Sequence, residues 1–358
     1  MPSLKEIKGR INSISSTLAI TSAMKMVAAA KLQKAQMAIQ NMLPYERRLH
    51  SMLIDLMGAM NISAAASEDG SVRGSGSAER GFDQSGDRLS LSNRHDLAGM
   101  DGAYSLMAQR EVRKVAIVAF ASNSSLCGAF NSNAIREATA VINEYRASGL
   151  GDADITVYSV GRKMAEAMKK LGFPSPADFT KMSDSPSYDA ASALAQELFD
   201  GFVSGRFDKV ELVYNHYKST SSQPTTRQTY LPLSLADATA DIQVGKITDS
   251  ASESDTNRGA EPVGAPVVRQ GSPTTEDLIV EPSKEELIAT LLPKVVRLRV
   301  FTTLLDSTAA EQAARTVAMQ LATDNGNDLL QELTLEYNKG RQQKITSEIL
   351  DLVGGSMQ

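Results

Sequence analysis

The sequence predicts an α/β fold, Rossmann-like, joined to a long antiparallel α-helical coiled coil formed by the N- and C-terminal helices. Three observations predict this fold. Apolar heptads run through both ends of the chain, over 1–60 and 283–358. Between them, short apolar runs alternate with helical patterns over 111–244, which is typical of a sheet flanked by helices. Because neither end has another partner of its own length, we expect the two long helices to pair with each other.

The first long helix begins at a capping box, Ser3-Leu4-Lys5-Glu6, whose serine and glutamate satisfy free backbone donors at a helix start. Two heptad rows that start at Leu4 and Ile7 are apolar at fourteen of their seventeen positions. The pattern predicts one helix over 3–60 with a local kink at Pro44. Such a seam requires a partner helix along its whole length.

This first helix is basic, although the whole chain carries a net charge of −5. Residues 1–60 hold eight Lys or Arg against three Asp or Glu. The excess is either an ordinary solvated helix face or an electrostatic match to an acidic partner. Lys25 occupies a seam position between Met24 and Met26, where it either extends its amine to solvent or marks a change of helix partner.

The middle of the chain predicts a small, mostly parallel sheet. Val115–Phe120 is a continuous apolar run, as expected of a strand that is buried on both faces. The other expected strands cover 154–160, 209–217 and 225–231, and the expected helices cover 131–147, 162–171 and 187–203.

The second long helix begins at another capping box, Ser283-Lys284-Glu285-Glu286, and is expected to run to about Val353. Six alanines between 309 and 322 keep one stretch narrow, which lets another helix approach closely. We expect Pro293 and Gly326 to bend or loosen the helix, and Pro293 is an alternative start for it.

Residues 61–110 and 245–282 read as flexible insertions. Sixteen of residues 61–109 are Gly or Ser, and 245–282 is rich in Gly, Pro and Ser with an acidic excess.

Composition excludes several classes of protein. Aromatic residues make up 5%, tryptophan is absent and the net charge is negative, so we expect no nucleic-acid partner. Cys127 is the single cysteine, which excludes a disulfide framework and a multi-cysteine metal site. No apolar run reaches the roughly 18 residues of a membrane-spanning helix, and the N-terminus lacks the apolar core of a signal peptide. These features predict a soluble, cytoplasmic chain.

Catalytic motifs are incomplete. Gly161-Arg162-Lys163 follows an expected strand but lacks the earlier glycine and the hydroxyl residue of a phosphate-binding loop, and Gly245-Lys246-Ile247 fails in the same way. Cys127 is either a nucleophile, if a histidine lies near it, or a small buried thiol at a strand end. His216 falls within an expected strand, where a structural role is commoner than metal binding. We therefore expect no catalytic residue, no cofactor and no metal.

Three segments carry longer signatures. The N-terminal one is Ile20-Thr21-Ser22-Ala23-Met24-Lys25-Met26-Val27-Ala28, and the central one is Leu126-Cys127-Gly128-Ala129-Phe130-Asn131. The C-terminal helix contributes Glu311-Gln312-Ala313-Ala314-Arg315, Ala322-Thr323-Asp324-Asn325, Tyr337-Asn338-Lys339-Gly340-Arg341-Gln342, Ile345-Thr346 and Val353-Gly354-Gly355. In this order, over about 1–60, 111–235 and 283–355, the chain resembles the gamma subunit of the F-type ATP synthase.

The resemblance implies the central rotor shaft of that complex, which couples proton flow through the membrane ring to ATP synthesis or hydrolysis in the alpha/beta hexamer. The coiled coil would lie inside the hexamer. The α/β domain would lie below it with the epsilon and c subunits, and the delta subunit belongs to the same complex. The chain would be a non-catalytic subunit, peripheral to the membrane at the cytoplasmic face of the bacterial plasma membrane.

The resemblance also implies contacts with the alpha/beta hexamer. Met24 and Lys25 would face the lever region of a beta subunit, with Arg315 nearby on the partnering helix. Gln342, Thr346 and Asp351 would fall where the shaft meets the collar of the hexamer.

The chain departs from the family at several points. Asn123-Ser124-Ser125 stands where the family usually has an Asp-Arg-Gly-like turn, which puts contacts through those charges in doubt. Gly340 replaces the usual alanine, at a cost of roughly 1 kcal/mol in a helix interior. The insertions 61–110 and 245–282 are either loops on the α/β domain or a lineage-specific brake on rotation.

Two other functions compete with the rotor. A coiled-coil scaffold protein unrelated to rotation would share the heptads but not the three signatures. A nucleotide-dependent enzyme with helical arms would require the isolated chain to bind nucleotide.

Overall fold

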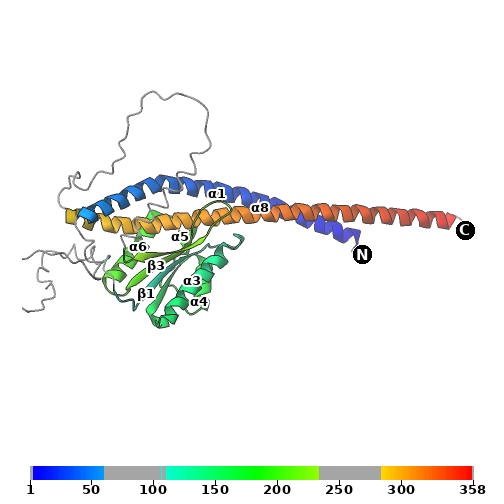
Figure 1. The fold of residues 1–358 in the computed structure, drawn as a ribbon. Coiled ribbons are helices and arrows are strands. Elements are labelled where there is room, and N and C mark those ends of the chain that lie inside the picture. The colour runs from blue at the N-terminus through cyan, green and yellow to red at the C-terminus, as the bar shows by residue number, and fades with distance from the viewer. Residues whose placement is uncertain (1–2, 60–105, 107–109, 234–283, 357–358) are drawn as a thin grey trace, which may run out of the picture.

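The computed structural model describes residues 3–59, 106, 110–233 and 284–356. Two helices, α1 (Leu4–Ala59) and α8 (Lys284–Ser356), run side by side in opposite directions, and an α/β unit lies against them at one end (Figure 1). We call this helix pair the shaft. It confirms the predicted combination of an α/β fold with an antiparallel coiled coil. The expected insertions at 61–110 and 245–282 fall outside the described residues, except for Leu106 and Arg110.

The heptad seam of α1 faces α8 as predicted. Every seam position from Leu4 to Leu53 is buried or half-buried, Lys25 included. The register is fixed at intervals by cross-helix hydrogen bonds, because Thr323 donates to Thr21 (3.1 Å) and Thr302 donates to Glu46 (3.1 Å). The seam therefore finds its partner within the same chain.

Pro293 and Gly326 do not interrupt α8, and Pro293 does not begin it. The helix begins at Lys284, before Pro293, and it continues without a break to Ser356. Next to Pro293, the side chains of Leu292 and Val295 are almost completely buried, at 0% and 1% exposure. Their burial against the sheet outweighs the loss of one backbone hydrogen bond at the proline.

Two glycines of α8, Gly326 and Gly340, face α1. A Cβ atom at Gly326 would lie 2.6 Å from Cδ2 of Leu18, and one at Gly340 would lie 3.1 Å from Cδ2 of Leu4. These positions let the backbones approach where α1 presents leucines. Since Leu4 is the first residue of α1, the last part of α8, from 341 to 356, extends beyond its partner helix (Figure 1).

The sheet has four strands, β1 (Val115–Phe120), β2 (Ile155–Val160), β3 (Lys209–Asn215) and β4 (Thr225–Leu231), in the order β2-β1-β3-β4. β1 pairs in parallel with β2 and β3, and β4 is antiparallel to β3. The predicted strand over 209–217 is two residues shorter, because His216 and Tyr217 turn away to contact the shaft.

Helices cover both faces of the sheet. α3 (Phe130–Ala147) and α4 (Arg162–Lys170) pack on the face to which Ile117 and Ala119 point. α6 (Tyr188–Val203) and α8 pack on the other face, with Val118 and Phe120. The sequence did not predict the short helices η2 (Asp152–Asp154) and α5 (Thr180–Asp184). Because α8 supplies part of the main core, the shaft and the α/β unit form one packed body.

Candidate functional site

The carboxyl ends of β1 and β3 form the place where an open parallel sheet usually binds a ligand, since the strand order reverses there. In this chain α8 covers that place. Its Ala310 is buried in a cluster with Cys127 and Phe130, and Ala314 and Tyr217 pack against the same cluster. The shaft thus occupies the position that a bound nucleotide takes in many α/β proteins.

The loop after β1 is shaped to meet α8. Asn131, in the first turn of α3, accepts from the backbone N–H of Ser122 (3.0 Å) and donates to the carbonyl of Ser124 (3.2 Å). Leu126 and Gly128 both have positive φ, 68° and 58°. The tight turn places Cys127 inside and Leu126 outside, at 1% and 59% exposure. We call residues 122–129 the β1 loop.

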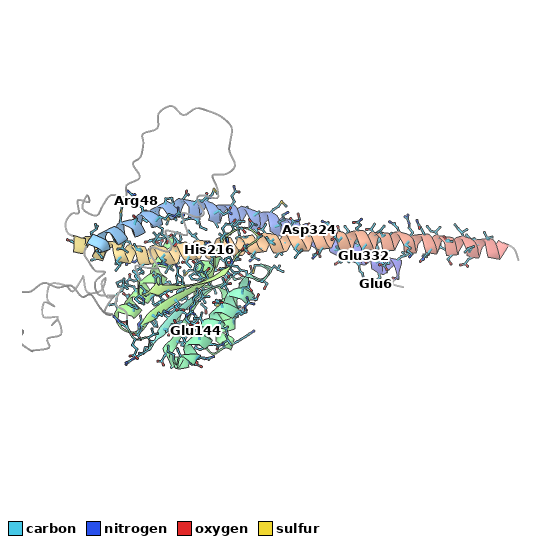
Figure 2. The ribbon with its side chains drawn as sticks, in the orientation of Figure 1. Glu6, Arg48, Glu144, His216, Asp324 and Glu332 are labelled. Atoms are coloured by element: carbon cyan, nitrogen blue, oxygen red, sulfur yellow. The ribbon has the colours of Figure 1, made fainter. Side chains whose placement is uncertain are left out.

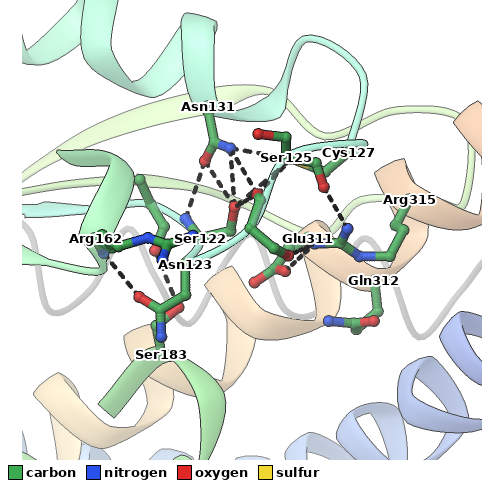
Figure 3. Close-up of polar contacts among 12 residues, drawn as sticks. Ser122, Asn123, Ser125, Cys127, Asn131, Arg162, Ser183, Glu311, Gln312 and Arg315 are labelled. Atoms are coloured by element: carbon green, nitrogen blue, oxygen red, sulfur yellow. Dashed lines mark hydrogen bonds and ion pairs between the residues drawn. The ribbon is translucent and has the colours of Figure 1, made fainter. Parts of the chain in front are cut away.

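Arg315 of α8 clamps this loop. Its guanidinium donates to the carbonyl of Ser125 (2.6 Å), the hydroxyl of Ser124 (2.9 Å) and the carboxylate of Glu311 (2.5 Å), as Figure 3 shows. Arg315 and Glu311 are only 8% and 7% exposed. Burial raises the pKa of Glu311, and the hydrogen bond from Arg315 opposes that shift. The buried pair therefore fastens the α/β unit to the shaft.

Asn123 fixes the other side of the β1 loop. Its side-chain oxygen accepts from the backbone N–H of Arg162 (2.7 Å), and its amide donates to the carbonyl of Thr180 (2.7 Å) (Figure 3). Ser183 adds a hydrogen bond to the carbonyl of Ala121 (3.0 Å). Asn123-Ser124-Ser125 thus forms a neutral turn whose polar groups bond within the chain.

A groove of about 640 Å³ lies between α1, α8 and the turn after α5. Met24 and Lys31 line it from α1, Gln312 and Arg315 from α8, and Asp184 from the last position of α5. The structure therefore brings together Met24 and Arg315, two residues that the sequence placed near the same partner. Lys25 is half-buried and follows Met24 in the sequence, but its side chain is not part of the groove lining.

The other predicted contact residues lie elsewhere. Gln342, Thr346 and Asp351 are exposed on the part of α8 that extends beyond α1. The Thr346 hydroxyl donates to the carbonyl of Gln342 (2.9 Å), a bond within the helix. The six predicted residues therefore form two separate groups, one on the paired part of the shaft and one on its free end.

A second polar contact was missed by sequence reasoning. Asp306 of α8 bonds with one carboxylate oxygen to His216 Nδ1 (2.6 Å) and with the other to the backbone N–H of Tyr217 (2.9 Å). The hydroxyl of Tyr217 accepts from Gln36 of α1 (2.6 Å). His216 lies where the α/β unit meets the shaft (Figure 2). The one signal in the sequence was the carboxylate itself, at the start of a stretch of small residues.

Neither a cluster of metal ligands nor a membrane-spanning helix occurs in the part of the chain that the structure describes. There, no three His, Cys, Asp or Glu side chains gather as metal ligands would. Within the same residues, no helix is both long and apolar enough to cross a membrane.

Known proteins resemble this chain over its whole length. A model of the ATP synthase family matches residues 3–357. The ATP synthase gamma chain of Phocaeicola vulgatus is 47% identical over 357 residues, 100% of both chains. The gamma chain of Bacteroides thetaiotaomicron is 45% identical over 358 residues, again 100% of both. A chain in the cryo-EM structure of the Euglena gracilis mitochondrial ATP synthase shares the fold, with a TM-score of 0.52 at 19% identity, covering 99% of this chain and 93% of that one.

Proposed function

We propose how this chain works from the premise that it belongs to the ATP synthase family and is a gamma chain, the central-stalk rotor of that complex. The family match spans both long helices and the α/β unit, which a coiled-coil scaffold unrelated to rotation would not explain. What remains to be proposed is the part that each region plays.

The chain transmits force and does not catalyse. One observation carries this proposal: α8 fills the crevice at the carboxyl ends of β1 and β3, where an α/β enzyme would hold its nucleotide. Cys127, the candidate nucleophile, is 1% exposed in the floor of that crevice. A side chain so deeply buried has no access to a substrate.

The partners are the alpha and beta subunits around the shaft and the epsilon and c subunits at the α/β unit, with the delta subunit in the same complex. The Euglena structure with the same fold is an OSCP, F1 and c-ring assembly, which supports such a set. The relatives are bacterial, which supports a peripheral position at the cytoplasmic face of the plasma membrane.

We assign two contact regions on the hexamer side. Met24, Lys25 and Arg315 would meet a beta subunit. Met24 and Arg315 line the groove, Lys25 neighbours Met24 on α1, and Lys31 adds a further positive charge to the lining. Arg315 belongs to this set because it lines the groove, although its three hydrogen bonds, to Ser125, Ser124 and Glu311, all lie within the chain.

Gln342, Thr346 and Asp351 form the second contact region, at the collar of the hexamer. An asymmetric shaft changes a catalytic site only through its differential contact energy with the conformations of that site. Rotation then passes this bias from one site to the next.

We also divide the chain by function. Residues 1–60 and 283–358 form the shaft, and 111–244 form the α/β domain that receives the torque. The predicted insertions at 61–110 and 245–282 lie outside the described residues, except for Leu106 and Arg110, and their assignment stays a prediction.

Co-purification tests the proposal. Tagged chain expressed with its own operon should retain the alpha and beta subunits in a complex that hydrolyses ATP. Lys25→Ala and Gln342→Ala should each assemble but lower coupled ATP synthesis, by about fivefold if about 1 kcal/mol of contact energy is lost. Gln40→Ala, at an exposed position of α1, is the matched control.

Two results would contradict the proposal. Tight, specific ATP binding by the isolated chain without assembly would favour a nucleotide-dependent enzyme. Unchanged coupled synthesis in both variants would remove those residues from the contact surface while leaving the rotor assignment in place.

A further inference from the structure

We propose that Tyr217 and Asp306 are positioning residues in a joint that fixes the angle between the α/β domain and both helices of the shaft. The joint consists of Gln36, His216, Tyr217 and Asp306, which come from α1, the segment after β3, and α8. It builds on the proposed function, because a defined angle matters only if the domain turns the shaft.

The hydrogen bonds of the joint point in different directions. Asp306 uses one oxygen for His216 Nδ1 (2.6 Å) and the other for the backbone N–H of Tyr217 (2.9 Å). A carboxylate held at both oxygens fixes the orientation of its partner as well as the distance. The backbone N–H of His216 donates to the carbonyl of Pro224 (2.9 Å), which ties this segment to the start of β4.

Tyr217 continues the joint to the other helix. Its hydroxyl accepts from Gln36 of α1 at 2.6 Å. Its ring packs against two buried clusters, one formed by Leu32, Ala35, Ala309 and Ala313 of the shaft, and one formed by Cys127, Phe130 and Ala310. One side chain therefore contacts α1, α8 and the β1 loop.

The location explains why directed bonds are needed there. At this level of the shaft, Ala309, Ala310 and Ala313 are completely buried and present only methyl groups. Small side chains let helices approach closely but interlock little, since side-chain ridges and grooves create the resistance to sliding. Polar bonds from Asp306 and Tyr217 supply that resistance at the side of the narrow stretch.

The joint predicts a mechanical effect that is distinct from stability. In the assembled complex, torque passes between the α/β domain and the hexamer, so the joint lies in the path between them. Loss of its bonds should soften the connection, and the domain should fluctuate over a wider range of angles while the hexamer still hydrolyses ATP.

The experiment uses the complete complex with its hexamer fixed to a surface and a probe attached to the exposed side of α4. The angular variance of the probe is recorded while the enzyme is stalled. Tyr217→Phe, Gln36→Leu and Asp306→Ala should each raise the variance about twofold, because each removes directed bonds of the joint.

Two matched variants separate the joint from general packing. Gln36→Glu should restore the normal variance, because the Tyr217 hydroxyl can donate to the new carboxylate. Tyr188→Phe should leave the variance unchanged, since it keeps its ring contact with Phe301 of α8 (5.7 Å between centroids). A purely structural role would lower the melting temperature of the complex without changing the variance of intact molecules.

Each outcome is decisive. Unchanged variance in Tyr217→Phe and Gln36→Leu, with hydrolysis intact, would overturn the joint and leave the proposed function standing. Equal variance in Gln36→Glu and Gln36→Leu would also overturn it. Failure of the unaltered chain to assemble with alpha and beta subunits would instead overturn the proposed function.

Discussion

The two ends of α8 differ in what surrounds them. In the paired part, Glu311 and Arg315 are buried and bond to each other and to the β1 loop. In the free part, beyond 341, Ile349 and Leu352 are 54% and 74% exposed in the chain alone. In Figure 2, His216 lies where the α/β domain meets the shaft, and Glu332 lies farther along the paired part, close to Glu6 at the N-terminal end of α1.

The difference shows which residues the chain itself explains. Polar side chains in the paired part are held by contacts within the molecule, so their substitution should lower the stability of the isolated chain. No other part of the described chain buries the exposed apolar side chains of the free part. Contiguous exposed apolar residues usually mark an interaction surface. Their substitution should affect the complex and leave the stability of the isolated chain unchanged.

The largest expected effect contrasts two ion pairs of α8. Arg315→Ala should destabilise the isolated chain by about 3 kcal/mol, because it leaves the buried carboxylate of Glu311 without its partner. Glu348→Ala removes the pair with Lys344, whose side chains are 63% and 65% exposed, and should change stability by less than about 1 kcal/mol.

Chemical denaturation of both variants measures this difference. Similar losses of unfolding free energy in Arg315→Ala and Glu348→Ala would mean that the paired part is no better ordered than the free part. Arg315→Lys is a useful control, because it keeps the charge but loses the forked geometry that reaches both Ser124 and Ser125.

A smaller effect separates the two glycines that face α1. Gly340→Ala should stabilise the chain by up to about 1 kcal/mol, because its Cβ would meet only the flexible end of Leu4 at the edge of the pairing. Gly326→Ala should gain nothing or lose about 1 kcal/mol, because its Cβ would lie 2.6 Å from Leu18 within the seam. Thermal melting of the two variants measures this difference. An equal rise in both melting temperatures would contradict this account.

The smallest expected effect depends on pH. The hydrogen bond to the Asp306 carboxylate raises the pKa of His216, and nearby Lys218 opposes the shift. A raised folded-state pKa means that protonated His216 stabilises the fold fully below its unfolded pKa of about 6.5. That contribution is lost as the pH rises through the folded-state pKa.

The imidazole is 46% exposed, so solvent limits this contribution to less than about 1 kcal/mol. Stability measured between about pH 5.5 and 8.5 should fall with rising pH, and His216→Gln should remove that part of the slope. An unchanged slope in the variant would show that other groups cause it.

Patterns of short range predicted much of this molecule. Heptads in 1–60 and 283–358 predicted both long helices, since the period of the apolar residues fixes which face of each helix is buried. The run Val115–Phe120 predicted the central strand, which is buried along its whole length. Pro293 misled, because a local propensity was overridden by the burial of Leu292 and Val295.

The sequence by itself determined the two long helices and their pairing, the four strands and the family, because apolar periodicity and signature residues are properties of neighbouring positions. Only the tertiary structure decided what Arg315, Asp306 and Tyr217 do. Arg315 lies 190 and 191 positions from Ser125 and Ser124. Asp306 lies 90 and 89 positions from His216 and Tyr217, and Tyr217 lies 181 positions from Gln36. A hydrogen bond between positions so far apart depends on how α8 crosses the sheet. The spacing of residues along the chain does not predict that crossing.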